Sequence, residues 1–248
     1  MKQRKRRRSP VLVIVLILIT FVMGFYSGKT FGLDDIKVIE TSSKTPQIDS
    51  IQPESNIDEK QPASELTAQC IVSDILLINS ENPLLEDYQP VGLISLYEQR
   101  DRHFQLAKSD IRILSNVFEA METMFSAAQI EGVDGFIITS GYRSFNEQSA
   151  LYLTRTDGTA ARPGTSEHET GLAFDVTAMG SENFSLTPQF EWLSQNCGEY
   201  GFILRYPANA ESITGTPYEP WHYRYVGLPH SKTIMDNGIT LEEYLAGW

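Results

Sequence analysis

Two short segments, well separated in the chain, constrain the fold more than any other feature of the sequence. Residues 166–175 read Ser-Glu-His-Glu-Thr-Gly-Leu-Ala-Phe-Asp, and residues 218–222 read Tyr-Glu-Pro-Trp-His. Between them they supply two histidines, an aspartate and a spare glutamate: His168, His222, Asp175 and Glu219. Three protein ligands with one position left open for water are typical of a catalytic zinc site. We therefore expect a fold that brings both segments to one zinc ion, with hydrolysis as the reaction.

A zinc hydrolase also needs groups that do not bind the metal. A free carboxylate must take a proton from the zinc-bound water, whose pKa falls to about 7, and pass it to the leaving amine. Glu219 lies three residues before His222 on a turn stiffened by proline, and it is the candidate base. Glu167 and Glu169 are rivals for this role, but they flank a candidate ligand and are equally well explained as solvated side chains.

The spacing of apolar residues predicts short elements of both kinds. Recurrence at three and four residues indicates a main core helix over residues 109–132. Capping boxes start further helices at Ser144 and Thr240, and Pro188 starts another. Short apolar stretches indicate four strands, at residues 136–139, 172–177, 202–205 and 222–226. This irregular alternation predicts a compact α+β domain with a small antiparallel sheet and flanking helices.

Arg143 lies at the junction between the first of these strands and the helix that follows it. Rigid scaffolds often present functional side chains at such junctions. A cation at the active site would stabilise the oxyanion of a tetrahedral intermediate. Position alone leaves this function and simple solvation of Arg143 equally open.

The N-terminus joins a basic cluster to an apolar run. Six of the 20 lysines and arginines lie in the first eight positions, and residues 11–26 are apolar except for Thr20 and Gly24. This run lies between the lengths of a transmembrane helix and of a cleavable signal, and no good cleavage site follows it. We therefore expect an uncleaved signal-anchor over residues 1–28, with the basic end in the cytoplasm and the rest of the chain outside.

The composition of the chain after this anchor indicates where the folded domain begins. Residues 29–69 are rich in Ser, Thr, Pro, Gln and acidic side chains, which predicts a disordered tether before a folded domain at residues 70–248.

Charge and cysteine content limit the partners of this chain. After Tyr26 the chain has 14 basic and 32 acidic side chains, a net charge of −18, which argues against a nucleic-acid partner. Cys70 and Cys197 lack metal-type spacing, so one disulfide and two separate thiols both remain open. We expect a monomer that contacts the membrane only through its N-terminal helix.

Four motifs occur in one order along the predicted domain. They are residues 140–144 (Ser-Gly-Tyr-Arg-Ser) with Gln148, residues 166–175, residues 201–207 (Gly-Phe-Ile-Leu-Arg-Tyr-Pro) and residues 219–227 (Glu-Pro-Trp-His-Tyr-Arg-Tyr-Val-Gly). Through these motifs the sequence from about Leu76 to the C-terminus resembles the VanY-type D-alanyl-D-alanine carboxypeptidases. The resemblance implies a compact α+β zinc-peptidase fold that is shared with the hedgehog signalling domain.

The resemblance also implies roles for individual residues. It implies one zinc ion on His168, Asp175 and His222, with Glu219 as general base and Arg143 as the group that polarises the scissile carbonyl and stabilises the oxyanion. Four further side chains would hold the peptide or line its pocket: Ser166, Gln148, Trp221 and Tyr142. The implied reaction is removal of the terminal D-alanine from peptidoglycan stem peptides.

Two matters stay open within this resemblance. After Pro207 many relatives carry a glycine-lysine pair, where this chain has Ala208-Asn209, and loss of a rim lysine would weaken capture of acidic substrate groups. The same catalytic set would also serve an L,D-carboxypeptidase on tetrapeptides or an endopeptidase. A third possibility is a catalytically silent, zinc-containing wall-binding module, but three ligands plus a free glutamate favour catalysis.

Overall fold

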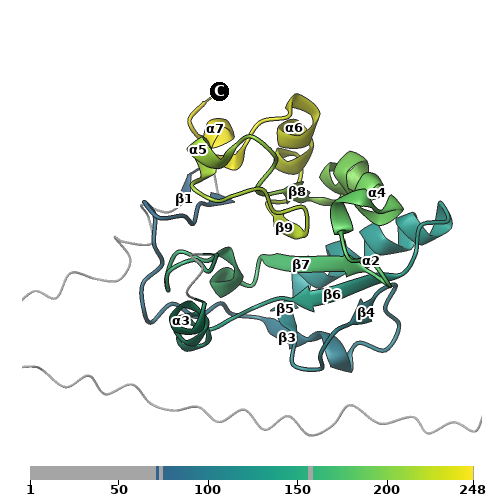
Figure 1. The fold of residues 1–248 in the computed structure, drawn as a ribbon, viewed down its shortest axis with the longest axis horizontal. Coiled ribbons are helices and arrows are strands. Elements are labelled where there is room, and N and C mark those ends of the chain that lie inside the picture. Colours follow the sequence, from purple (N-terminus) through teal and green to yellow (C-terminus); the bar gives the residue numbers. More distant parts are fainter. Residues whose placement is uncertain (1–70, 73–74, 156–158, 248) are drawn as a thin grey trace, which may run out of the picture. The chain divides into compact units, whose positions relative to one another are not determined.

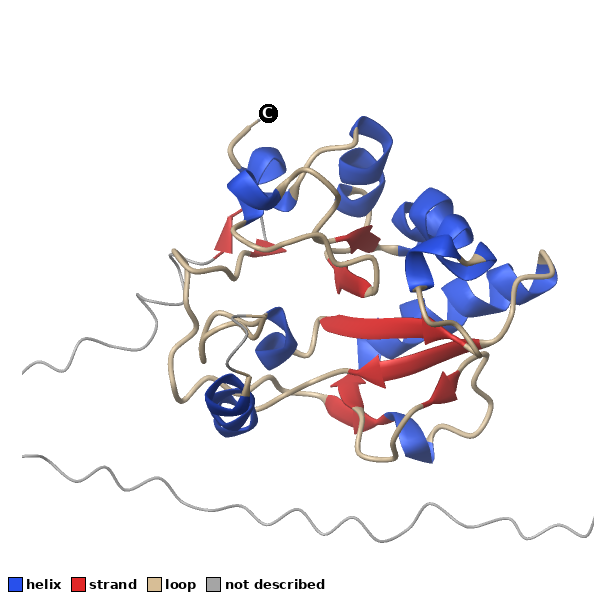
Figure 2. Ribbon diagram, in the orientation of Figure 1, coloured by secondary structure: helices blue, strands red, loops and turns tan. Residues whose placement is uncertain are grey.

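The computed structural model describes residues 71–72, 75–155 and 159–247. The predicted signal-anchor and the whole of the predicted tether lie outside these residues. Within the described part of the chain, no helix is both long and apolar enough to cross a membrane. The described residues form an α+β arrangement in which helices surround a central sheet (Figures 1 and 2).

The central sheet has five strands in the order β4-β6-β7-β9-β8. The strands are β4 Gln105–Leu106, β6 Phe136–Ser140, β7 Ala173–Ala178, β8 Phe202–Leu204 and β9 His222–Tyr225. Pairing is antiparallel from β6 to β8, as predicted, but β4 runs parallel to β6. The prediction of an antiparallel sheet is therefore wrong at this edge. The chain between β4 and β6 contains helix α2 (Ser115–Ile130), and a helical crossover returns a strand in the same direction.

Helix α2 begins six residues later than the apolar spacing predicts. The preceding residues form strand β5 (Arg112–Leu114), which pairs with β3 (Leu93–Ser95). Ile111 and Ile113 are both buried. Two apolar residues two positions apart fit one face of a strand as well as they fit the start of a helix. The pairing with β3 decides between these conformations, and β3 lies in a region expected to be loop-rich.

The remaining elements are short. They are strands β1 Ile71–Val72 and β2 Ile75–Leu76, the α-helices α3 Phe145–Thr154, α4 Pro188–Asn196, α5 Glu211–Thr214, α6 His230–Asn237 and α7 Leu241–Leu245, and the 3-10 helices η1 Leu96–Glu98, η2 Glu167–Thr170, η3 Phe184–Leu186 and η4 Cys197–Tyr200. The predicted capping boxes are present at Ser144 and Thr240, where each hydroxyl accepts from the backbone N–H three residues later. Thr187 caps α4, as its position before a proline predicts.

The core lies between α2 and one face of the sheet. The ring of Phe125 on α2 lies 4.8 Å from that of Phe136 and 6.0 Å from that of Phe174. Side chains alternate along a strand, so Asp175, which follows the buried Phe174, lies on the opposite face. Asp175 is also the register partner of His222 on β9. The sheet therefore presents both residues side by side on the face that does not pack against α2.

Candidate metal centre and active-site cleft

His168, Asp175 and His222 meet at one point of this face. Each offers a ligand atom, and these atoms lie within 4.8 Å of one another. His168 Nε2 lies 3.3 Å from Asp175 Oδ2, and His222 Nδ1 lies 3.1 Å from Asp175 Oδ1. His168 comes from η2, and Gly171, with a φ of 70°, turns the chain from η2 into β7. Only glycine adopts this left-handed conformation readily, so the turn that joins the two ligands depends on it.

The second nitrogen of each imidazole has its own partner. His168 Nδ1 lies 2.7 Å from the carbonyl oxygen of Gly141, which can only accept, so Nδ1 carries the proton and Nε2 keeps its lone pair. His222 Nε2 lies 3.3 Å from the carboxylate of Glu167, which leaves the lone pair on Nδ1. Metal-binding histidines characteristically donate their other N–H to a carbonyl or carboxylate in this way. Two lone pairs and one carboxylate directed at a common point fit a zinc ion.

The charges of this site are strongly coupled. Burial opposes the ionised form of Asp175, but the two histidines outweigh burial and hold its pKa well below its usual range. Burial opposes the charge of His222, but its hydrogen bonds to Asp175 and Glu167 outweigh burial and raise its pKa to about 9. A divalent cation would take the place of the proton on His222, because a ligating imidazole must be neutral.

Glu219 lies beside the ligand set without belonging to it. Its Oε2 is 3.8 Å from His222 Nδ1, and burial raises the pKa of its carboxyl. Its backbone N–H donates to the carbonyl oxygen of Tyr206 at 3.1 Å, which holds the turn that precedes β9. A carboxylate at the edge of the metal site, within the same cleft but outside the candidate ligand set, is placed to accept a proton from a water molecule there.

Three side chains hold the guanidinium of Arg143 in the same cleft. Its Nε donates to Gln148 Oε1 at 2.9 Å, its Nη1 to Ser140 Oγ at 3.0 Å, and its Nη2 to Ser166 Oγ at 3.5 Å. Within the described residues, no carboxylate forms an ion pair with it. Gln148 is fully buried, and its amide nitrogen donates to the carbonyl oxygen of Ala161 at 2.7 Å. Gln148 therefore positions Arg143, in addition to any contact with the peptide.

The two glutamates that flank His168 are not solvated, so that explanation of them is wrong. Glu167 is fully buried and binds Arg205 and Arg224 through one carboxylate oxygen, Oε1, at 2.7 and 2.8 Å. Glu169 is also buried, and its Oε1 accepts from the backbone N–H of Gly164 at 2.8 Å. Both carboxylates are occupied by structural partners, which leaves Glu219 as the free one. The sequence signal for this was a pair of arginines beside apolar residues, Arg205 directly after β8 and Arg224 within β9, because a buried arginine requires a carboxylate.

A cleft of about 820 Å³ opens over the metal site. Its lining includes the three candidate ligands, Glu219, Arg143, Ser166, Gln148 and Trp221. Arg155 and Arg162 also line it, and both are exposed, so the rim is basic although the expected glycine-lysine pair is missing. Tyr142 instead lines a neighbouring hollow of about 610 Å³, where its ring lies 4.9 Å from the Arg112 guanidinium.

Cys197 takes no part in this site. It is a free thiol with no exposed surface. Burial raises its pKa to about 12. Cys70, the possible disulfide partner of Cys197, lies outside the described residues.

The site has two histidines and one carboxylate around a common point, a further glutamate beside them, and a firmly held arginine in the same cleft. These features define a zinc-dependent peptidase site. Residues 110–228 match the family model described as VanY, D-alanyl-D-alanine carboxypeptidase. The chain is 32% identical over 238 residues to a D-alanyl-D-alanine carboxypeptidase of Enterococcus faecium, covering 94% of this chain and 77% of that protein. The chain therefore belongs to the VanY family of D-alanyl-D-alanine carboxypeptidases and is a zinc metallo-carboxypeptidase.

Solved structures resemble this chain over the same region. The LdcB LD-carboxypeptidase has a TM-score of 0.62 and 34% identity, covering 71% of this chain and 92% of that chain. A variant of the vancomycin-resistance D,D-pentapeptidase VanY, solved in complex with Zn(II), has a TM-score of 0.55 and 34% identity, covering 68% of this chain and 97% of that chain. One of these solved relatives is named as an LD-carboxypeptidase and the other as a D,D-pentapeptidase, and both share the fold of this chain.

Proposed function

We propose that this enzyme removes the C-terminal D-alanine from peptidoglycan stem peptides outside the membrane, with a D-Ala-D-Ala end as its preferred substrate. The observation that carries the proposal is Glu219, a carboxylate that shares the cleft with the ligand set but is excluded from it. A binding module would have no use for such a group. The D,D-carboxypeptidase relative that aligns over nearly the whole chain supports the choice of bond.

The residues of the cleft divide the reaction between them. A zinc ion bound at His168, Asp175 and His222 would lower the pKa of a water molecule and polarise the scissile carbonyl. Glu219 takes the proton of the attacking water and returns it to the nitrogen of the departing D-alanine. Arg143 donates hydrogen bonds to the oxygen that becomes negative in the tetrahedral intermediate.

The basic rim of the cleft suits an anionic peptide. Arg155 and Arg162 lie on a chain whose net charge is −12, so their placement at this cleft concentrates positive charge where the substrate enters. A stem peptide ends in a carboxylate, which these side chains would attract. They would take over the capture that a rim lysine would otherwise provide.

An L,D-carboxypeptidase is the alternative function, and the similarity to the LdcB LD-carboxypeptidase favours it. Both functions use the same ligands, base and arginine. They differ in the configuration of the residue that precedes the cleaved bond. An endopeptidase that cuts within cross-linked stems is a further variant of the same chemistry.

Product analysis separates these functions. We expect the full-length protein, loaded with zinc, to release D-alanine from a pentapeptide stem faster than from a tetrapeptide stem, as measured by mass spectrometry. Faster release from the tetrapeptide would establish the L,D alternative, and internal cleavage of cross-linked stems would establish the endopeptidase. Zinc binding without turnover of any of these peptides would contradict the proposal.

The base is tested by a matched pair of substitutions. Glu219→Gln removes the proton acceptor but keeps the shape of the side chain, so we expect turnover to fall about 10²–10⁴-fold with zinc still bound. Glu182→Gln makes the same chemical change at an exposed position outside the cleft and should leave turnover unchanged. Wild-type turnover by the Glu219→Gln variant would exclude Glu219 as the base.

The proposed location rests on the N-terminal sequence. A basic cluster followed by an apolar run supports a single-pass anchor with the catalytic domain on the outer side, and we propose a monomer there. In intact cells from which the wall has been removed, external protease should degrade the domain of the membrane-bound protein. Protection from the protease, or recovery in the cytosolic fraction, would contradict this location.

A further inference from the structure

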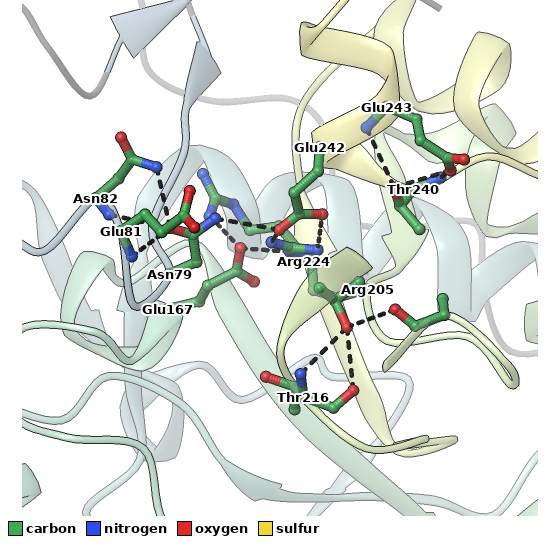
Figure 3. Close-up of polar contacts among 12 residues, drawn as sticks. Asn79, Glu81, Asn82, Glu167, Arg205, Thr216, Arg224, Thr240, Glu242 and Glu243 are labelled. Carbon is green, nitrogen blue, oxygen red and sulfur yellow. Dashed lines mark hydrogen bonds and ion pairs between the residues drawn. The ribbon is translucent and has the colours of Figure 1, made fainter. Parts of the chain in front are cut away.

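A cluster of four charged side chains, three of them buried, lies directly behind His222. Its members are Glu167, Arg205, Arg224 and Glu242, and Figure 3 shows them as one connected set. Glu167 and Arg205 have no exposed surface. The two carboxylates and two guanidiniums balance one another, as buried charges must. None of the four has a role in the chemistry described above.

Glu167 connects this cluster to the metal ligand. Its Oε2 lies 3.3 Å from His222 Nε2, while its Oε1 accepts from Arg205 Nε at 2.7 Å and from Arg224 Nη1 at 2.8 Å. The two oxygens of one carboxylate are therefore divided between the imidazole and the arginines. The orientation of His222 depends on where the arginines hold Glu167.

The two arginines are anchored differently. Arg224 has two backbone partners besides Glu167, the carbonyl oxygens of Tyr225 at 3.0 Å and Leu76 at 2.6 Å. Among the described residues, the outer nitrogens of Arg205 have one hydrogen-bond partner, the carboxylate of Glu242, which accepts from Nη1 at 2.9 Å and from Nη2 at 2.6 Å. Bidentate pairing of this kind fixes a guanidinium in direction as well as in position.

Glu242 belongs to α7, the last helix of the described chain. It lies 37 residues from Arg205 in the sequence, and among the described residues none of its hydrogen bonds or ion pairs is with a candidate ligand. Its partner Arg205 follows strand β8, and the backbone N–H of Arg205 donates to the carbonyl oxygen of His222 at 3.3 Å. The C-terminal helix therefore reaches the metal centre by a continuous path of hydrogen bonds.

We infer that Glu242 is a positioning residue for the metal centre, acting on His222 through Arg205 and Glu167. Within the part of the chain that the structure describes, Glu167 is the only other carboxylate paired with Arg205, so without Glu242 the cluster keeps two buried positive charges against one negative. Glu167 then moves toward the arginines and holds the His222 N–H less well. Loss of the group that directly holds a metal-binding histidine typically weakens metal binding by 10–100-fold, so displacement of Glu167 should weaken it toward the lower end of this range.

Metal affinity provides the test, measured on the full-length protein by competition with a chromophoric chelator. We expect Glu242→Ala to raise the zinc dissociation constant about tenfold or more. Glu242→Gln, which can still accept from Arg205 but lacks the charge, should raise it less. The absorption spectrum of the cobalt-substituted Glu242→Ala protein should also differ from that of the wild type, because the direction of the His222 ligand changes.

Glu243→Ala is the matched control on the same helix. Glu243 closes the capping box with Thr240 and does not contact Arg205, so its loss should lower the melting temperature and leave zinc affinity and the cobalt spectrum unchanged. If Glu242→Ala behaves in the same way as Glu243→Ala, Glu242 only stabilises α7 and the inference is wrong. Should Glu242→Ala fail to fold, Glu242→Gln decides: a wild-type zinc dissociation constant overturns the inference, and a raised one supports it.

The inference rests on the proposed zinc-dependent function, but its readout requires no peptide. Failure of the enzyme to release D-alanine would count against the proposed function alone. Unchanged metal affinity in the Glu242 variants would count against the positioning role alone.

Discussion

Arg143 shows how one side chain is prepared for catalysis before any substrate arrives. Ser140, Gln148 and Ser166 hold its guanidinium, and Gln148 is itself held by the backbone of Ala161. An arginine fixed by neutral partners keeps its positive charge available for a developing oxyanion. A group preorganised in this way needs little rearrangement at the moment of reaction, which is the main source of electrostatic catalysis.

We expect Arg143→Ala to lower kcat about 10²–10³-fold, because the oxyanion loses its donor. Arg143→Lys should restore part of the loss, since a lysine keeps the charge but not the planar set of donors. Steady-state kinetics on the pentapeptide stem would measure both. Arg100→Ala, at an exposed position outside the cleft, serves as the control. An unchanged kcat in Arg143→Ala would remove Arg143 from the mechanism.

At the scale of elements, the turn between β6 and α3 contributes to the metal centre and to the oxyanion site together. Gly141 accepts from His168 Nδ1 through its carbonyl oxygen, and Arg143 follows two residues later. The turn packs tightly: a side chain at position 141 would clash with the carbonyl oxygen of Arg112 and lie 2.9 Å from Ile111 Cγ2. Packing against strand β5, which includes Arg112, thus fixes the position of this turn.

Gly141→Ala should therefore destabilise the fold by about 1–3 kcal/mol, as overpacking does, and weaken zinc binding as well. Ser144→Ala, in the same turn, removes the cap of α3 and should cost about 1 kcal/mol without any effect on zinc. Denaturant unfolding and chelator competition would measure the two quantities. If both variants lowered stability alone, the Gly141 carbonyl would have no part in holding His168.

At the scale of the whole molecule, the metal centre lies on a domain whose folding does not depend on the metal. The core between α2 and the sheet is a continuous cluster of aromatic and aliphatic side chains on the other face of β7 and β9. Such a core supplies folding free energy independently of the metal, unlike that of a zinc finger. Zinc should therefore add stability to a domain that is already folded.

Removal of zinc should lower the melting temperature without unfolding the protein. At a free zinc concentration of about 1,000 times the dissociation constant, binding contributes about 4 kcal/mol, which corresponds to a shift of about 10 °C for a domain of this size. Calorimetry with and without chelator would measure the shift, and circular dichroism would show that secondary structure persists. Unfolding of the metal-free protein at 25 °C would contradict this view.

Much of the fold could be predicted from local chemistry. The capping residues Ser144, Thr187 and Thr240 begin helices where they were expected, because a cap is a contact between residues only three apart. The parallel edge strand β4 and the strand at β5 could not be predicted. Each depends on a partner strand remote in the sequence, and local periodicity carries no information about pairing.

By itself, the sequence determined the ligand types, the free glutamate and the elements that present them. The residue types follow from the chemistry that each can perform, and the elements follow from short-range spacing. Only the tertiary structure decided what Glu167 and Glu169 do, because their partners Arg205, Arg224 and the Gly164 backbone come together through folding alone. Burial then turned two apparently solvated carboxylates into supports of the metal centre. A buried charge needs a partner, and the chain supplies that partner from distant residues.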